Sequence, residues 1–301
     1  MAEFRPTWPP ESPHPGSPPP APGRPGSGWA LLWRFTLLFA LGVFVLGWLL
    51  LRFETHQLYF PTPLRGESPE QWGLHPEEVP VTTGDGEKLN AWWLPSDRSG
   101  GPVLLFLHGN AGNREDRLPI LKGLYPTGLS TLILDYRGYG GSSGTPTEDG
   151  LIQDGLAAYD WLAASQPGRP ILLFGESLGG AVAAQVALRR TPAGLILASA
   201  FTSVPDLAER LYPVPGLRRI VRTQFNTLAA LRRLQLPLLI IHGERDEIVP
   251  FDMGETLMRE SASPSKTLYA VPNAHHNDAY FVAGEDYWRW VREFAMNAGK
   301  R

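Results

Sequence analysis

The residue with the clearest chemical signature is Ser177, in the sequence Gly-Glu-Ser-Leu-Gly at 175–179. Apolar residues at 171–174 predict a buried strand before it, and the Ala-rich run 180–188 predicts a helix after it. A Gly-x-Ser-x-Gly turn between a strand and a helix strains the serine backbone and lifts its hydroxyl out of the sheet. The flanking glycines avoid clashes with the neighbouring strand and helix. The stretch therefore predicts a nucleophilic serine, against the plainer interpretation of a tight turn with a surface serine.

A serine hydroxyl becomes a good nucleophile only beside a base, and the base needs an orienting acid. When the nucleophile sits on a strand-turn-helix, the acid and then the histidine follow it in the chain, on loops at strand ends. An apolar strand at 237–241 leads into His-Gly-Glu-Arg-Asp-Glu at 242–247. Another at 267–271 leads into Pro-Asn-Ala-His-His-Asn-Asp at 272–278. The sequence thus contains an acid loop and a histidine loop in the required order.

A third loop could stabilise negative charge. His-Gly-Asn-Ala-Gly-Asn at 108–113 follows the apolar strand 103–107. Glycines there leave backbone N–H groups free to face a developing oxyanion, and the second donor would be the N–H of Leu178, which follows the nucleophile.

Strands and helices alternate around these loops. Strands are expected at 78–83, 88–94, 103–107, 131–134, 171–174, 195–198, 237–241 and 267–271. Helices are expected at 114–124, 152–163, 180–188 and around Tyr287, Val291 and Phe294. The pattern predicts an α/β fold with a mostly parallel eight-stranded sheet, helices on both faces and an antiparallel hairpin at its start.

The insertion at 199–236 is expected to form a small cap, with helices at 204–212 and 217–234. A cap of this size predicts an open site. Its arginines are Arg210, Arg218, Arg219, Arg222, Arg232 and Arg233. They are consistent with a solvated basic face and with contact to anionic lipid headgroups.

The 301-residue chain has a net charge of −3 and no cysteine, so nucleic-acid binding, disulfides and cysteine-based zinc sites are not expected. Residues 1–28 are rich in Pro, Gly and Ser and predict a disordered tail. Residues 52–76 are expected to be a connector and 77–301 the globular domain.

Residues 29–51 are predicted to form a single transmembrane anchor. Their one charge is Arg34, tryptophans lie near both ends, and a helix of this length spans about 34 Å. A cleaved signal peptide is the alternative, but the apolar run is long and no small-x-small cleavage site follows it. Equal numbers of arginines precede and follow the charge-free part of this run, so the positive-inside rule leaves its orientation in the membrane open. The prediction leans to a catalytic domain outside the cytoplasm, because a single N-terminal anchor commonly acts as an uncleaved signal.

From about Tyr59 onward, the chain resembles the bud-emergence-protein-like branch of the α/β-hydrolase superfamily, which includes membrane-anchored serine hydrolases. The matching sequences are Tyr-Phe-Pro at 59–61, the loop at 108–113, Asp-Tyr-Arg-Gly-Tyr-Gly-Gly-Ser-Ser-Gly at 135–144, Gly-Glu-Ser-Leu-Gly-Gly at 175–180, His-Gly-Glu-Arg-Asp at 242–246 and His-Asn-Asp at 276–278. The resemblance implies an α/β-hydrolase fold. It also implies roles for five residues: nucleophile Ser177, orienting acid Asp246, base His276, and the N–H groups of Asn110 and Leu178 as oxyanion hole.

Several neighbours compete for these roles. Glu244 and Glu247 flank Asp246, and only the motif position selects Asp246. His275 stands where the family usually has glycine, so either it or His276 could be the base.

The remaining polar residues near these loops are given structural roles. Asp278 is expected to hydrogen-bond locally and to set the histidine loop. His108 and His242 are expected to be packing residues, and 135–137 an ion-paired structural loop. No pair of histidines has the helical spacing of metal ligands, and no nucleotide-binding sequence is present, so no metal or other cofactor is expected.

These observations predict a serine hydrolase that cleaves esters or thioesters of acyl chains through an acyl-enzyme intermediate, with a lipid or small-molecule ester as substrate. The alternatives are a serine peptidase or amidase on the same fold, and a non-catalytic binding protein, because a fold does not determine a function.

Overall fold

The computed structural model describes residues 27–97, 100–212 and 214–300. The expected disordered tail, 1–28, lies outside the described residues except for its last two positions. The chain divides after Leu51, and Arg52–Arg301 forms one compact unit. The expected connector, 52–76, therefore falls within the same unit as the sheet.

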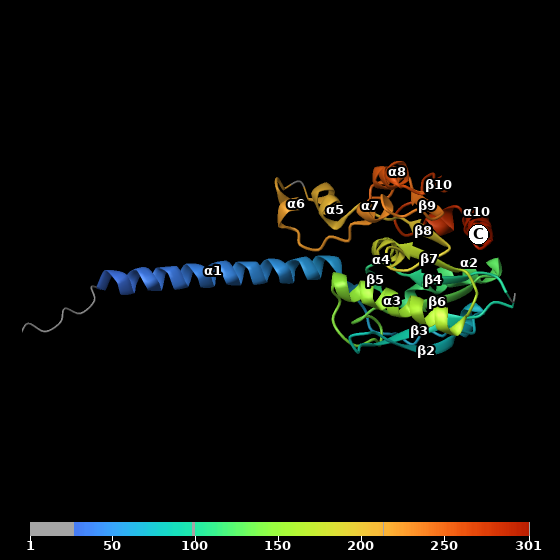
Figure 1. The fold of residues 1–301 in the computed structure, drawn as a ribbon, viewed down its shortest axis with the longest axis horizontal. Coiled ribbons are helices and arrows are strands. Elements are labelled where there is room, and N and C mark those ends of the chain that lie inside the picture. Colours follow the sequence, from blue (N-terminus) through green and yellow to red (C-terminus); the bar gives the residue numbers. More distant parts are fainter. Residues whose placement is uncertain (1–26, 98–99, 213, 301) are drawn as a thin grey trace, which may run out of the picture. The chain divides into compact units, whose positions relative to one another are not determined.

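Eight strands form one sheet in the order β10-β9-β8-β7-β4-β6-β3-β2 (Figure 1). Their bounds are β2 Glu77–Thr82, β3 Lys88–Leu94, β4 Val103–Leu107, β6 Ser130–Leu134, β7 Ile171–Glu176, β8 Gly194–Ala198, β9 Leu238–Gly243 and β10 Lys266–Val271. Strand β3 pairs antiparallel with β2 and β6, and all other pairs are parallel. The predicted eight-stranded, mostly parallel sheet with an antiparallel hairpin at its start is confirmed.

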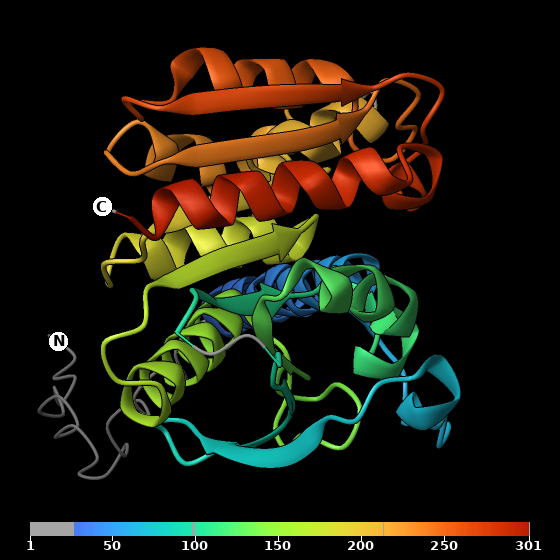
Figure 2. The same cartoon turned by 90° about the vertical axis from the view of Figure 1, so that its right-hand side faces the viewer.

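Helices cover both faces of the sheet, because successive side chains of a fully buried strand point to opposite sides. In β4, Leu105 belongs to one hydrophobic cluster and Phe106 to the other. Side chains of α3, α4 and α8 pack into the first cluster, and those of α2 and α10 into the second, where α10 lies over the sheet and runs along the strands (Figure 2). The bounds are α2 Leu118–Leu124, α3 Glu148–Ser165, α4 Leu178–Ala187, α7 Thr227–Leu231, α8 Phe251–Glu260, α9 Ala279–Val282 and α10 Glu285–Ala298, with 3-10 turns η1 Pro69–Trp72, η2 Arg114–Arg117 and η3 Tyr125–Thr127.

The cap departs from its prediction in one place. Helix α5 spans Val204–Leu211, close to expectation, but the second expected helix, 217–234, is broken into α6, Leu217–Ile220, and α7. The break follows from Phe225, which is fully buried with a φ of 37°. A positive φ at a bulky residue is incompatible with a continuous helix.

The apolar run 29–51 lies in α1, Ser27–Leu58, where side chains such as Trp33 and Phe39 are exposed. Within the described residues, no helix has both the length and the apolar character needed to cross a membrane. This finding does not support the transmembrane anchor expected at 29–51.

The chain after α1 adds a small second sheet. Strand β1, Phe60–Pro61, pairs in parallel with β5, Ala111–Gly112, inside the loop that follows β4. Residues far apart in the sequence thus meet beside the end of β4.

Candidate active site

Ser177 occupies the turn between β7 and α4 with φ 51° and ψ −115°, a conformation rarely adopted by a residue with a side chain. The turn is tight enough to require its glycines. A Cβ on Gly175 would collide with the backbone of Gly179 and Gly180, and a Cβ on Gly179 would collide with the carbonyl of Leu107. The predicted strand, turn and helix around the serine are therefore present, and the reason for the glycines is the predicted one.

Three predicted side chains form a continuous hydrogen-bonded chain. The hydroxyl of Ser177 lies 3.1 Å from Nε2 of His276, and Nδ1 of that ring lies 2.8 Å from Oδ2 of Asp246. They come from the carboxyl ends of β7, β10 and β9, which lie on the same edge of the sheet. The contacts bridge 99 and 30 residues of sequence. Strand order, rather than local sequence, brings the three residues together.

The charge of Asp246 determines which nitrogen of His276 carries a proton. Burial by itself raises the pKa of Asp246, but hydrogen bonds from His242, His276 and the Val249 N–H outweigh burial and hold that pKa well below its usual range. The ionised carboxylate can only accept, so Nδ1 of His276 donates to it. Nε2 is then left free to accept the proton of Ser177.

These three side chains are more deeply buried than the small cap led us to expect. Ser177 is 7% exposed and His276 is 8% exposed. The expectation of an open site is thus not met at the nucleophile itself. A buried position strengthens the electrostatic contacts along the chain from Asp246 to Ser177, because there is little water to screen them.

The predicted oxyanion loop lies beside the nucleophile. A Cβ placed on Gly109 would lie 3.7 Å from Cβ of Ser177. The carbonyl of Asn110 accepts hydrogen bonds from the Phe60 N–H at 2.9 Å and the Tyr139 hydroxyl at 2.7 Å, which holds this loop in place. Leu178 is the first residue of α4, where helical N–H groups have no partner inside the helix. The loop that carries Asn110 and the residue after the nucleophile, Leu178, thus both adjoin Ser177.

An ion pair ties the loop to the turn. Nε of Arg117 donates to the Glu176 carboxylate at 2.7 Å, and its Nη2 donates to the Ala111 carbonyl at 3.1 Å. Glu176 directly precedes the nucleophile, so Arg117 connects the two backbones that would surround an oxyanion.

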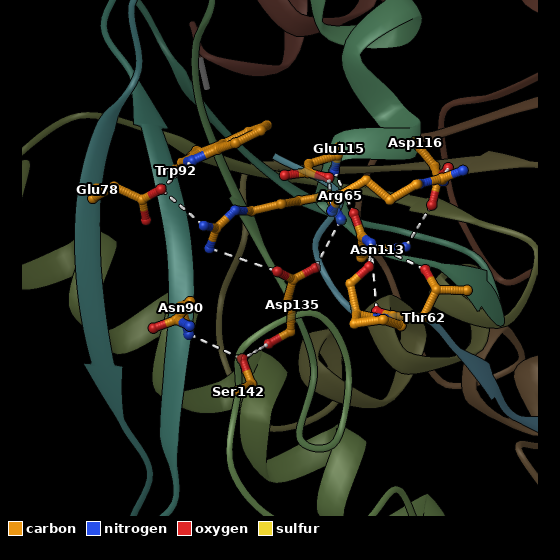
Figure 3. Close-up of polar contacts among 12 residues, drawn as sticks. Thr62, Arg65, Glu78, Asn90, Trp92, Asn113, Glu115, Asp116, Asp135 and Ser142 are labelled. Carbon is orange, nitrogen blue, oxygen red and sulfur yellow. Dashed lines mark hydrogen bonds and ion pairs between the residues drawn. The ribbon is translucent and has the colours of Figure 1, made fainter. Parts of the chain in front are cut away.

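Farther from the serine, a polar network anchors the same loop (Figure 3). The buried Asn113 side chain caps η2 through the Glu115 N–H and donates to Oγ1 of Thr62 at 3.0 Å. Asp135, at the end of β6, accepts the Arg114 N–H at 2.7 Å. The Arg114 guanidinium lies 4.7 Å from the centre of the Trp92 ring and 2.8 Å from Glu78. The network joins Thr62 after β1, strands β2 and β3, the end of β6, and η2 around the loop. Asp135 pairs with Arg114 at 3.5 Å and Arg137 with Asp154 at 2.8 Å, so 135–137 is an ion-paired loop as expected.

Asp135 predicts a measurable pH dependence of stability. Burial raises its pKa to about 6, against the opposing charge of Arg114. Because the folded-state pKa lies above the unfolded value, the carboxyl favours folding below about pH 4 and loses that contribution as the pH rises through 6. Relative to Asp135→Asn, the wild type should lose about 2 kcal/mol of unfolding free energy between pH 4 and 7. Urea unfolding of both proteins across this range measures the difference, and parallel curves would contradict it.

The residues that compete with His276 and Asp246 in the sequence do not contact the Ser177 hydroxyl. Nδ1 of His275 is 2.8 Å from Oε2 of Glu247, on the exposed surface, and neither contacts the Ser177 hydroxyl. Asp278 accepts the His275 N–H at 2.6 Å and so sets the loop, as expected. His108 is fully buried against Tyr136, and burial followed by the charge of Arg117 lowers its pKa to about 3, consistent with a packing role.

His242 has a contact that was not predicted. Its ring is fully buried, and Nε2 lies 2.9 Å from the Val249 carbonyl and 3.3 Å from Oδ2 of Asp246. Both of these groups are acceptors, so Nε2 carries the proton and acts as a second side-chain donor to the acid, beside His276. The spacing His242-x-x-x-Asp246 was visible in the sequence, but a loop of unknown conformation gives no reason to direct the ring at the carboxylate.

His242→Ala should lower activity on the order of tenfold, because it removes one donor from a buried carboxylate. The pKa of Asp246 should rise toward its ordinary value, so activity relative to the wild type should fall further below about pH 4, as this carboxyl becomes protonated. His242→Gln is the matched control, because its side-chain N–H can occupy the place of Nε2–H and should restore the profile. A pH profile of the alanine variant identical to wild type would limit His242 to packing.

Among the described residues, no group of three His, Asp or Glu side chains is arranged to hold a metal ion. The arrangement from Asp246 to Ser177 can instead move a proton from a hydroxyl to an imidazole. Such a constellation suits attack on an acyl carbonyl.

Comparison with known proteins places the chain in a family. Residues 101–222 and 210–278 match the family described as serine aminopeptidase, S33. Protein bem46 of Schizosaccharomyces pombe is 31% identical over 237 residues, which cover 75% of this chain and 79% of that protein. The lysophosphatidylserine lipase ABHD12 of Rattus norvegicus is 33% identical over 202 residues, 60% of this chain and 50% of that protein.

Among solved structures, the Pyrococcus furiosus esterase Pf2001 superposes with a TM-score of 0.68 at 22% identity, over 80% of this chain and 98% of the esterase. At this identity the likeness establishes the fold alone. The sheet order, the turn at Ser177 and the sequence relatives agree: the chain belongs to the bud-emergence-protein-like branch of the α/β-hydrolase superfamily.

Proposed function

We propose that the protein is a serine hydrolase that cleaves carboxylic esters or thioesters of acyl chains. The observation that carries the proposal is the hydrogen-bonded chain from Asp246 through His276 to Ser177, with distances of 2.8 and 3.1 Å. The relatives support an ester hydrolase in general, since one of them is a lipase. An intact chain of this kind also argues against a non-catalytic binding protein.

In the proposed reaction, His276 takes the proton of Ser177 as its oxygen bonds to the acyl carbonyl carbon. The N–H groups of Asn110 and Leu178 stabilise the oxyanion, and Asp246 stabilises the imidazolium. His276 then gives its proton to the departing alcohol or thiol, which leaves an acyl ester on Ser177. A water molecule attacks this ester, gives one proton to His276 and releases the carboxylic acid, and the proton returns to the serine.

The test has two parts. A fluorophosphonate probe should label the wild type, because it reacts with an activated serine. A series of p-nitrophenyl esters of graded chain length then gives the acyl preference, and the corresponding p-nitroanilides separate an esterase from an amidase. Labelling with no turnover of any ester, together with cleavage of anilides or aminoacyl amides, would favour the peptidase that the family description suggests.

We further propose that residues 29–51 hold the enzyme at a membrane and that its substrates are long-chain acyl esters. The apolar run with its tryptophans supports the anchor. Tethering raises the local concentration of membrane substrates without any new contact. The full-length protein should stay with membranes after a carbonate wash, and its recovery in the soluble fraction would remove the anchor from the proposal.

A further inference from the structure

Residues 205–223 form a part of the cap whose two flanking segments are held in place by hydrogen bonds. The N–H of Val204 donates to the Gln224 carbonyl at 2.9 Å and joins the two segments that flank this stretch. The Glu148 carboxylate accepts the N–H groups of Gln224 and Phe225, each at 2.6 Å. In Figure 1, the two helices of this stretch, α5 and α6, extend away from the sheet. The stretch is thus a projection whose two ends are fixed to the catalytic unit.

The far end of the projection exposes apolar side chains. Leu211, Tyr212, Val214 and Ile220 are between 42% and 55% exposed, and we call these four residues the cap tip. Single exposed apolar residues are ordinary, but four within ten positions mark a surface that contacts something apolar.

Basic residues accompany the cap tip. Residues 205–223 contain four arginines against two carboxylates, Asp206 and Glu209. Arg218 pairs with Asp206 at 2.9 Å, and Arg210 pairs with Asp252. The Arg219 side chain is exposed, and it has no ion pair or hydrogen bond with another described residue. The surface therefore combines exposed apolar groups with positive charge that the fold does not neutralise.

We infer that the cap tip docks on the surface of a bilayer that contains anionic phospholipid. Leucine, valine and isoleucine side chains can enter the acyl boundary, while arginine guanidinium groups bind headgroup phosphates just above it. Tyrosine suits the interface because its ring is apolar and its hydroxyl is polar. The positive charge of the arginines favours an anionic bilayer as the partner, since an apolar protein surface would not require them.

A contact of the cap tip with a residue that follows the apolar run 29–51 also favours a bilayer as its partner. The Tyr212 hydroxyl lies 3.5 Å from Oε1 of Gln57, which follows the apolar run 29–51 by six residues. Six residues can span at most about 21 Å. A bilayer that held the run would thus be within reach of the cap tip. This step rests on the proposed anchor, whereas the composition of the surface does not.

The chain has no cysteine, so a single cysteine can report on one site. Val214→Cys is labelled with an environment-sensitive nitrobenzoxadiazole dye in the full-length protein. The protein is reconstituted into vesicles of phosphatidylcholine, or of phosphatidylcholine with phosphatidylglycerol in both leaflets, so either orientation meets the anionic lipid. In the anionic vesicles, the emission should move to shorter wavelength and be quenched by nitroxide-labelled lipid. In neutral vesicles and in 1 M salt, both effects should be much weaker, because salt screens the arginines.

Matched controls separate docking from general insertion. Ala164→Cys, exposed at the end of α3, should show no spectral change with either lipid. Arg219→Gln with Arg222→Gln should reduce the quenching at position 214. The double variant Arg289→Gln, Arg292→Gln removes the same charge from α10 instead. It should leave the quenching at position 214 unchanged.

Three results would overturn the inference. One is identical emission at position 214 in neutral and anionic vesicles, and another is equal quenching at position 164. The third is a blue shift without lipid that grows with protein concentration, which would assign the cap tip to a second copy of the chain. Hydrolysis of a short soluble ester, measured on the same samples, tests the catalytic proposal independently, because Val214 is outside the catalytic chain.

Discussion

Ser177→Ala should lower the rate of ester hydrolysis by about 10³-fold or more while the protein remains folded. The hydroxyl is the atom that would bond to the acyl carbon, and members of such a triad act as a unit. Nothing else on the hydrogen-bonded chain can replace it, because His276 and Asp246 are positioned to move and balance a proton. The measurement is kcat/KM on a short p-nitrophenyl ester, together with labelling by the fluorophosphonate probe, which should vanish.

Ser199→Ala is the matched control. Ser199 is also buried near the site, but its hydroxyl donates only to the His276 carbonyl, at 3.3 Å. Its loss should change the rate by less than about tenfold, since no group that moves a proton is removed. Urea unfolding of both variants checks that the fold is intact. Activity of Ser177→Ala within tenfold of the wild type would reject Ser177 as the nucleophile.

His276→Ala should match the loss caused by Ser177→Ala, whereas His275→Ala should have little effect. His276 is 3.1 Å from the serine hydroxyl, while His275 is 53% exposed in its side chain and pairs with Glu247 at 2.8 Å. Without the imidazole at 276, the hydroxyl has no acceptor for its proton, which costs on the order of 10³-fold. The rates of the two variants, measured on the same short ester, rank the two imidazoles.

Glu247→Gln is the companion control, because it disrupts the exposed pair without touching His276. A larger loss for His275→Ala than for His276→Ala would move the base to residue 275.

Much of the fold could be predicted because its signals are local. An apolar run such as Val103–Leu107 is long enough to be a buried strand, and its bounds in the structure are the predicted ones. The turn at Ser177 was equally accessible, because the glycines that make it possible are direct neighbours in the chain. Such features depend on residues a few positions apart, so they can be recognised without knowledge of the rest of the fold.

The sequence by itself therefore determined where the strands lie along the chain, the turn that presents Ser177, and the loops on which an acid and a histidine follow. Only the tertiary structure decided which neighbours face each other: His276 rather than His275 meets the serine, and His242 joins Asp246. It also broke the second cap helix at Phe225. These outcomes depend on side-chain directions and strand order over tens of residues. Sequence spacing cannot specify them, because a shift of one residue in a loop turns a side chain toward a different partner.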